Sequence, residues 1–248
     1  MTDDHFTNEK MLKSITENMY EAIALSHQFY LKLENAELYD EIKILRHQMS
    51  CCFKVLGAVA NANEMKKYES GLNEKVFDVT SLIRDIVDNC RSKLRSHCIS
   101  LEFSDCEPMM VLCDPDRFTA CLLNIIVNSL QNIDREEGAV RFSVKQRGEY
   151  INVTVTDNGY GVAHGEDISN YRSDSGLAVI NRFCESVGTT PIFETGENSG
   201  FSVSLRLPMA TDGGMDIASC RAGLDLGTFS PVNIYLAKVD YINISDIC

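Results

Sequence analysis

The chain has 248 residues, with 23 lysines and arginines against 36 aspartates and glutamates, so its formal net charge is −13. Because nucleic-acid binding needs a basic surface, and no cluster of Lys or Arg occurs along the sequence, this composition argues strongly against a nucleic-acid binder. Apolar residues make up 44% and charged residues 24%, which predicts a folded protein with one or two hydrophobic cores.

The N-terminus and the cysteines bear on localisation. The first five residues are polar and acidic, unlike a signal peptide, and no run of about 18 apolar residues occurs in the sequence. The ten cysteines show no paired metal-ligand spacing, and several lie within apolar stretches, as Cys51, Cys52 and Cys121 do. These features predict a cytoplasmic protein with reduced thiols and no membrane insertion.

Residues 8–70 are predicted to form a helical hairpin. They contain no Pro and one Gly, and their apolar residues recur at spacings of three and four in two heptad patterns separated by Asn35–Glu37. A second apolar row gives the later helix another face to bury: Ile44, Cys51, Val55, Ala58, Ala62 and Met65. A homodimer that forms a four-helix bundle would bury both faces, and packing of the helical pair on the chain's own second domain is the alternative.

From residue 76 to residue 208 the pattern is that of a mixed domain. Helices are predicted at 81–97, 116–133 and 175–187, and strands at 99–103, 109–113, 140–146, 151–156 and 200–207. Helices on one side of a mostly antiparallel sheet form a two-layer α/β sandwich. The predicted fold class is therefore α+β, a helical hairpin followed by this sandwich, with residues 209–248 as a C-terminal extension of undetermined structure.

Two polar clusters stand on the predicted elements of the second domain. Asn124 and Asn128 lie four residues apart on one face of an apolar helix. Buried amides need partners, and a Mg²⁺ ion with phosphate oxygens would supply them. The alternative is that both are core amides bonded to backbone or water. The segment 157–161, Asp-Asn-Gly-Tyr-Gly, follows a strand, and its carboxylate could accept from an exocyclic amine such as that of adenine. An isolated Asp-Asn-Gly is more often a turn, but the two clusters in this order are more specific than either alone.

These segments resemble the sensor histidine kinases of two-component systems, whose catalytic domain belongs to the ATPase superfamily shared with DNA gyrase and a class of heat-shock chaperones. The resemblance extends from about residue 36 to Pro208. Residues 114–117 and 122–129 are similar to the N box of that family, and residues 157–161 and 176–183 to its two glycine boxes. It implies a domain that binds ATP, with Asn124 and Asn128 holding Mg²⁺ and phosphates, Asp157 contacting adenine, and Gly159, Gly161 and Gly176 shaping the pocket.

The resemblance also implies that the phosphate passes from ATP to a hairpin histidine and then to the receiver domain of a response regulator. The family's usual hairpin length points to residues 14–20, which contain no His. His27, beside Ser26 of the heptad pattern, is the remaining candidate for the catalytic phosphoacceptor, although its neighbour Gln28 is not an acid. His47 is a weaker candidate because it lies on the second predicted helix.

Three departures from the family pattern favour an alternative. Gln131 stands where a basic residue commonly contacts phosphate, and the second glycine box retains one of three glycines, with Asp174 and Ala178 at the other two positions. Residues 161–173 are also short for an ATP lid. These departures favour a degenerate kinase that acts as a phosphotransfer or scaffold protein with weak or no ATP binding. A serine kinase of the anti-sigma type is less favoured because it does not need the long hairpin.

Overall fold

The computed structural model describes the following residues: 57, 60–62, 64–94, 99–104, 106–133, 138–161, 176–196, 199–210 and 231–236. Residues 58–224 belong to one compact unit. The second unit comprises residues 1–57 and 225–248, of which only Gly57 and the short helix α6 (Pro231–Leu236) are described. All residues of the candidate site that are described lie in the first unit.

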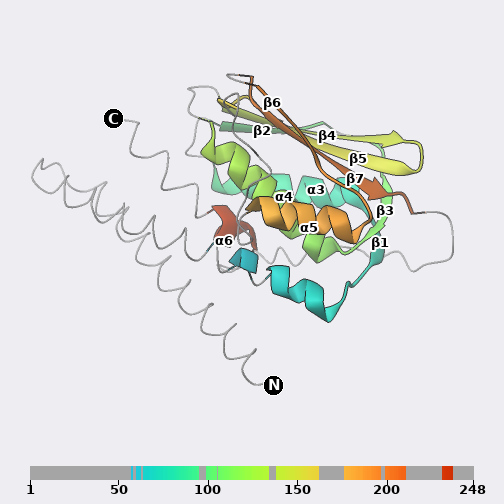
Figure 1. Ribbon diagram of the computed structural model, residues 1–248. Helices are drawn as coiled ribbons and strands as arrows, with labels where there is room; N and C mark the ends of the chain where they lie inside the picture. Colours follow the sequence, from blue (N-terminus) through green and yellow to red (C-terminus); the bar gives the residue numbers. More distant parts are fainter. Residues whose placement is uncertain are drawn as a thin grey trace, which may run out of the picture. The chain divides into compact units, whose positions relative to one another are not determined.

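A five-stranded sheet with three helices on one face makes the two layers of this unit (Figure 1). The strand order is β2-β4-β5-β7-β6, and only the β2–β4 pair is parallel. The strands are β2 (Ile99–Phe103), β4 (Gly138–Arg147), β5 (Tyr150–Asp157), β6 (Ile192–Thr195) and β7 (Phe201–Pro208). The helices are α3 (Val79–Lys93), α4 (Pro115–Gln131) and α5 (Gly176–Ser186). The predicted mixed fold, with a mostly antiparallel sheet packed on helices, is confirmed for this unit.

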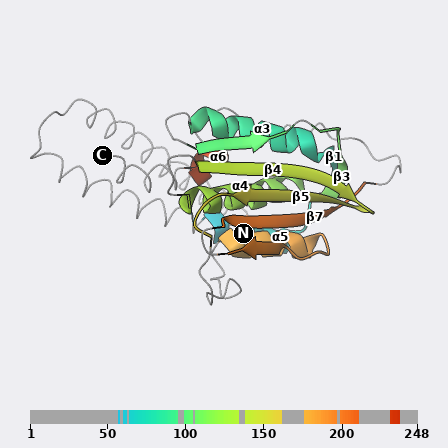
Figure 2. The same ribbon diagram turned by 90° about the horizontal axis from the view of Figure 1, so that it is seen from above.

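The core lies between these layers because side chains alternate along each strand. Ile151, Val153 and Val155 of β5 are buried, whereas the residues between them are only half-buried. Seen from above, β4, β5 and β7 run side by side across the helices (Figure 2). Helix α4 is buried along most of its length and packs on α5, with the rings of Phe118 and Phe183 5.7 Å apart. The most apolar predicted helix is thus the central one.

Aspartate caps determine where two of the helices begin. Asp114 accepts hydrogen bonds from the backbone N–H groups of Asp116 and Arg117 at the start of α4. Asp78 accepts from Thr80, which is why α3 begins at Val79, two residues before the predicted start. Partial burial opposes ionisation of Asp78, but hydrogen bonds from Ser81, Thr80 and Met109 lower its pKa below the usual value.

The structure contains three short elements that the sequence did not predict, namely η1 (Tyr68–Ser70), β1 (Lys75–Asp78) and β6. Strand β1 pairs with β3 (Met110–Cys113) in a separate antiparallel ladder, and β6 adds an edge to the main sheet. The short 3₁₀ helix η1 follows helical residues 64–67, where the predicted hairpin ends. The remainder of the hairpin, including His27 and His47, lies outside the described residues. Among the residues described, no helix is both long and apolar enough to cross a membrane.

Candidate functional site

Asn124 lies in the middle of α4, and its side chain is only 2% exposed. Its Nδ2 donates a hydrogen bond of 2.9 Å to the carbonyl oxygen of Ala120, one turn earlier. A Cβ atom on Gly176 would lie 2.7 Å from Asn124 Oδ1, so a larger residue at the start of α5 would press on this amide. The first residue of α5 therefore packs directly against Asn124.

Asn128 follows one turn later on the same face of α4 and is half-buried. Its carbonyl oxygen accepts a hydrogen bond of 2.7 Å from Asn132 Nδ2, at the C-terminal end of the helix. Gln131 is half-buried on the last turn, and the only cationic side chain in α4 is Arg117, near its other end. The part of α4 that carries both asparagines therefore presents amides but no positive charge.

Asp157 ends β5, and its side chain is 3% exposed. One carboxylate oxygen, Oδ1, accepts hydrogen bonds from the backbone N–H groups of Gly159 (3.0 Å) and Phe201 (3.1 Å). The other oxygen, Oδ2, is buried and has no hydrogen-bond partner among the described residues. Because an unsatisfied buried acceptor costs about 1–3 kcal/mol, a ligand that donates an N–H to this oxygen would be favoured.

Close backbone packing surrounds Asp157. A Cβ atom on Gly159 would collide with the carbonyl oxygen of Asn132, and Tyr160 N–H donates to the same carbonyl (3.1 Å). Gly161 has a φ of +69°, and a Cβ there would collide with the carbonyl oxygen of Gly196. The two glycines thus let the segment after β5 lie against the end of α4 on one side and the β6–β7 hairpin on the other.

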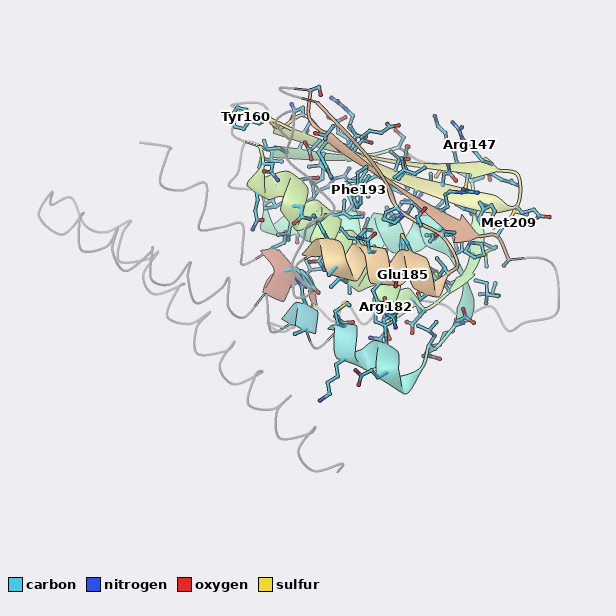
Figure 3. All side chains as sticks on the ribbon, viewed as in Figure 1. Arg147, Tyr160, Arg182, Glu185, Phe193 and Met209 are labelled. Carbon is cyan, nitrogen blue, oxygen red and sulfur yellow. The ribbon has the colours of Figure 1, made fainter. Side chains whose placement is uncertain are left out.

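The structure brings the predicted motifs together at two places. Asn124 meets Gly176, whereas Gly159 and Tyr160, which follow Asp157, meet the end of α4 one turn after Asn128. Tyr160, which is 47% exposed, lies at the rim of this end of the sheet (Figure 3). Asp174 and the rest of the segment 162–175 lie outside the described residues, as does His27.

Sequence reasoning missed the contribution of the β6–β7 hairpin. The Phe201 N–H that binds Asp157 comes from a residue 44 positions later in the chain. Gly200, with a φ of +79°, allows this approach, because a Cβ there would collide with the carbonyl oxygen of Asp157. Gly200, the first residue of the predicted last strand, was the only local signal for this contact.

The donors and acceptors of Asp157 and Asn124 can be compared with those that an adenine base and a metal ion require. Asp157 Oδ2 offers a buried acceptor without a partner, which matches an exocyclic amine. The Asn124 amide already donates to Ala120 and packs against Gly176. That hydrogen bond is donated by Nδ2, so it does not use Oδ1, which is the atom of this amide that would ligate Mg²⁺.

The sequence is similar to a known protein family and to several known proteins. A family model described as "Histidine kinase-, DNA gyrase B-, and HSP90-like ATPase" matches residues 113–211. Sporulation kinase B of Bacillus subtilis (strain 168) is 24% identical over 186 residues, which make up 71% of this chain and 42% of that protein. Sensor histidine kinase ZraS of Escherichia coli (strain K12) is 27% identical over 145 residues, 54% of this chain and 31% of that protein. The chain thus spans less than half the length of these relatives.

Solved structures share the fold. Histidine kinase AdeS of Acinetobacter baumannii superposes with a TM-score of 0.53 at 16% identity, covering 81% of this chain and 96% of that chain. Histidine kinase ThkA, in complex with response regulator protein TrrA, superposes with a TM-score of 0.55 at 18% identity, covering 81% of this chain and 61% of that chain. At these identities the structural likeness shows the fold alone.

Proposed function

Because this chain is a protein of the histidine-kinase type, we propose that it acts in two-component signalling, binding an adenine nucleotide in its ATPase-type domain and exchanging phosphate with a response regulator. The buried, unpartnered oxygen of Asp157 is the observation that carries the nucleotide part of this proposal. Three of the relatives and neighbours described above have names that identify them as histidine kinases. The partner proposal is supported by the complex of ThkA with its response regulator.

In this proposal Asp157 selects the base. Oδ1 is held in place by the N–H groups of Gly159 and Phe201, so Oδ2 is left to accept from the amine of adenine. Two backbone hydrogen bonds fix the carboxylate from both sides, so little conformational entropy remains to be lost when the ligand binds. Gly159 and Gly161 let the segment after β5 pack closely on the end of α4 and on the β6–β7 hairpin beside this carboxylate.

Asn124 and Asn128 would hold Mg²⁺ through their amide oxygens, together with phosphate oxygens and water. When bound, this ion would offset the negative charge of the phosphates. Helix α4 itself supplies no positive charge there, because it carries Gln131 at the position where similar proteins commonly have a basic residue. What this chain contributes here is position: one helix face presents both amides a single turn apart.

His27 is proposed as the phosphoacceptor. A ring nitrogen attacks the γ-phosphorus, the bond from this phosphorus to the bridging oxygen breaks, ADP leaves, and the ring proton passes to solvent. Gln28 cannot accept that proton, so we expect the step to be slow. The phosphoryl group then passes from His27 to an aspartate of the receiver domain.

A degenerate kinase that serves as a phosphotransfer or scaffold protein is the second candidate. The absence of a cation on α4 beyond Arg117 favours it, because no positive charge of this helix offsets the charge of a triphosphate near the two asparagines. In that case phosphate would reach the hairpin histidine from a phosphorylated regulator rather than from ATP.

Calorimetry with Mg-ATP tests the nucleotide part. Asp157→Asn keeps an oxygen for the Gly159 and Phe201 N–H groups but replaces Oδ2 by an amide that cannot accept, so we expect affinity to fall about 10-fold or more. Asp116→Asn, at the exposed position of the first turn of α4, is the matched control and should bind like the wild type. Equal affinity of Asp157→Asn and wild type would contradict adenine recognition by Asp157.

Transfer of label separates the two candidates. Wild type and His27→Ala are incubated with γ-labelled ATP and, separately, with a phosphorylated receiver domain. If ATP labels the wild type but not His27→Ala, the active kinase is supported. If the wild type takes label only from the phosphorylated receiver domain, the phosphotransfer protein is supported. No label from either source would overturn both phosphate-transfer proposals.

A further inference from the structure

The face of the sheet that points away from the helices is polar. Because side chains alternate, the residues that face away from the core include Ser143 and Lys145 of β4, Thr154 of β5 and Ser204 of β7. Thr154 and Ser204 share a hydroxyl–hydroxyl hydrogen bond of 2.8 Å across the strands. Figure 3 shows Arg147 extending from this side, with α3, α4 and α5 on the other.

Three exposed cations gather at one end of this face, and we refer to Lys145, Arg147 and Arg206 as the cationic patch. In register, Lys145 pairs with Asn152, and Asn152 pairs with Arg206, so these three side chains lie across three neighbouring strands. Arg147 pairs with Tyr150, one row further along. Neighbouring strands are about 4.8 Å apart and alternate residues about 7 Å, so one acidic segment could reach all three charges.

Acidic residues on the same face are too distant to neutralise the patch. Glu102 of β2 pairs with Arg141, which lies four residues before Lys145 on β4. Glu194 of β6 pairs with Ser202, which lies four residues before Arg206 on β7. Four residues of strand span about 13 Å, which exceeds the Debye length of about 8 Å at physiological ionic strength. Glu102 is also already paired with Arg141 at 2.9 Å. Glu149, in the β4–β5 turn, is the acid nearest to the patch along the chain. Its single negative charge cannot offset three positive charges, so the patch remains net positive.

The patch is partly ordered before any partner binds. The guanidinium carbon of Arg206 lies 4.6 Å from the centre of the Tyr150 ring, a cation–π contact that restricts the arginine. Asn152, between Lys145 and Arg206, is uncharged, so no carboxylate separates the two cations. Restricting a long side chain in advance reduces the entropy lost on binding.

We propose that the cationic patch is a docking surface for an acidic segment of a partner protein. Charge complementarity carries this assignment, because the patch is locally positive on a chain whose net charge is −13. Three cations are fewer than the roughly 6–10 phosphate contacts of a protein that binds nucleic acid strongly through its backbone. A short carboxylate-rich segment matches the patch in size, and arginine guanidinium groups bind carboxylates through paired N–H donors.

The test uses the full chain and a fluorescein-labelled peptide of six glutamates, followed by fluorescence anisotropy at about 50 and 150 mM salt. The triple variant Lys145→Gln, Arg147→Gln, Arg206→Gln should weaken binding at least fivefold. Arg141→Gln is the matched control, since Arg141 lies on the same face but is paired with Glu102, and it should bind like the wild type. A thermal melt of each variant confirms folding.

Carbodiimide cross-linking then locates the bound peptide. Lys145 should couple to the peptide in preference to Lys75, an exposed lysine of β1 outside the patch. The proposal is overturned if the triple variant binds like the wild type, if Arg141→Gln weakens binding equally, or if Lys75 couples as readily as Lys145. It is also overturned if duplex DNA or anionic vesicles bind the patch more tightly than the peptide does.

Discussion

Gly161 shows how one residue of the candidate site depends on its backbone surroundings. Gly161 and Gly148 both have left-handed φ values, +69° and +61°. An added Cβ at Gly161 would collide with the carbonyl oxygen of Gly196 and lie 2.8 Å from that of Gly200, whereas nothing lies within 4 Å at Gly148. The two positions therefore separate the cost of the conformation from the cost of packing.

We predict that Gly161→Ala lowers the free energy of unfolding by about 2–4 kcal/mol, and Gly148→Ala by about 1–2 kcal/mol. The left-handed conformation accounts for the loss at both positions, and displacement of the β6–β7 hairpin adds to it at Gly161. Urea denaturation of both variants measures the difference. Equal losses would show that Gly161 is not held against the hairpin.

Two buried thiols predict a pH dependence of stability. Burial raises the pKa of both Cys90 and Cys184 to about 12, from an ordinary value of 9.0. The folded state therefore keeps these thiols protonated at a pH where the unfolded chain releases the protons. Their contribution is complete below pH 9 and is lost as the pH rises from 9 towards 12.

At pH 10 we expect each thiol to lower the free energy of unfolding by about 1.4 kcal/mol relative to pH 8. Urea denaturation at both pH values, with Cys90→Ala compared against wild type, isolates the contribution of Cys90 from that of tyrosines and lysines. The variant should lose less stability between the two pH values. An identical loss in both proteins would rule out a buried, protonated Cys90.

At the scale of elements, an ion pair and an aromatic contact join residues 64–68, at the start of η1, to helix α4. Glu64 and Arg117 are 3.0 Å apart, with side chains 16% and 9% exposed. The guanidinium of Arg117 also lies 4.8 Å from the centre of the Tyr68 ring. The Tyr68 hydroxyl is buried without a partner, and burial raises its pKa well above the usual value. This cluster is where the predicted hairpin joins the mixed domain.

We predict that Glu64→Gln lowers the free energy of unfolding by about 1–3 kcal/mol, because a nearly buried Arg117 loses its closest counter-ion. Glu102→Gln is the matched control, since its partner Arg141 is exposed and the pair should contribute almost nothing. Tyr68→Phe removes an unsatisfied hydroxyl and should leave stability unchanged or raise it. Chemical denaturation of the three variants would contradict this account if Glu64→Gln matched Glu102→Gln.

The elements that sequence predicted best are those with strong local patterns. Alternation located β4 and β5 to within two residues at each end, and the apolar run with its Asp-Pro start located α4. Strand β6 escaped prediction because its four residues are exposed or half-buried and pair only at the sheet edge. The position of Asp157 at a strand end followed from its motif, whereas its bond to Phe201 depends on a strand pairing that no local pattern encodes.

For the whole molecule, net charge alone was an incomplete guide. The net charge of −13 is a sum over the whole chain and does not show how charges are distributed on the surface. Strand pairing brings Arg206 beside Lys145 and Arg147, although about 60 residues of sequence separate them. The opposite holds at the candidate site, where α4 offers no cation beyond Arg117. Local charge, which depends on strand register, therefore decides which ligands each surface favours.

The oligomeric state is the prediction that belongs to the whole chain. The second apolar row predicted for residues 38–70 would be buried if a second copy of the chain completed a four-helix bundle, so we predict a homodimer. Light scattering should therefore give a mass of about 55 kDa, twice the 27.7 kDa of one chain. Val55→Asp places a charge in that row and should produce monomers, because burying an unpaired carboxylate costs several kcal/mol.

Lys54→Asp is the matched control, since Lys54 belongs to neither apolar row and the new charge can remain in solvent. We expect this variant to stay dimeric and to melt within a few degrees of the wild type. A monomeric wild type would favour the alternative, in which the helical pair packs on the chain's own mixed domain. A Val55→Asp variant that remains dimeric would place the contact between copies elsewhere than on the second apolar row.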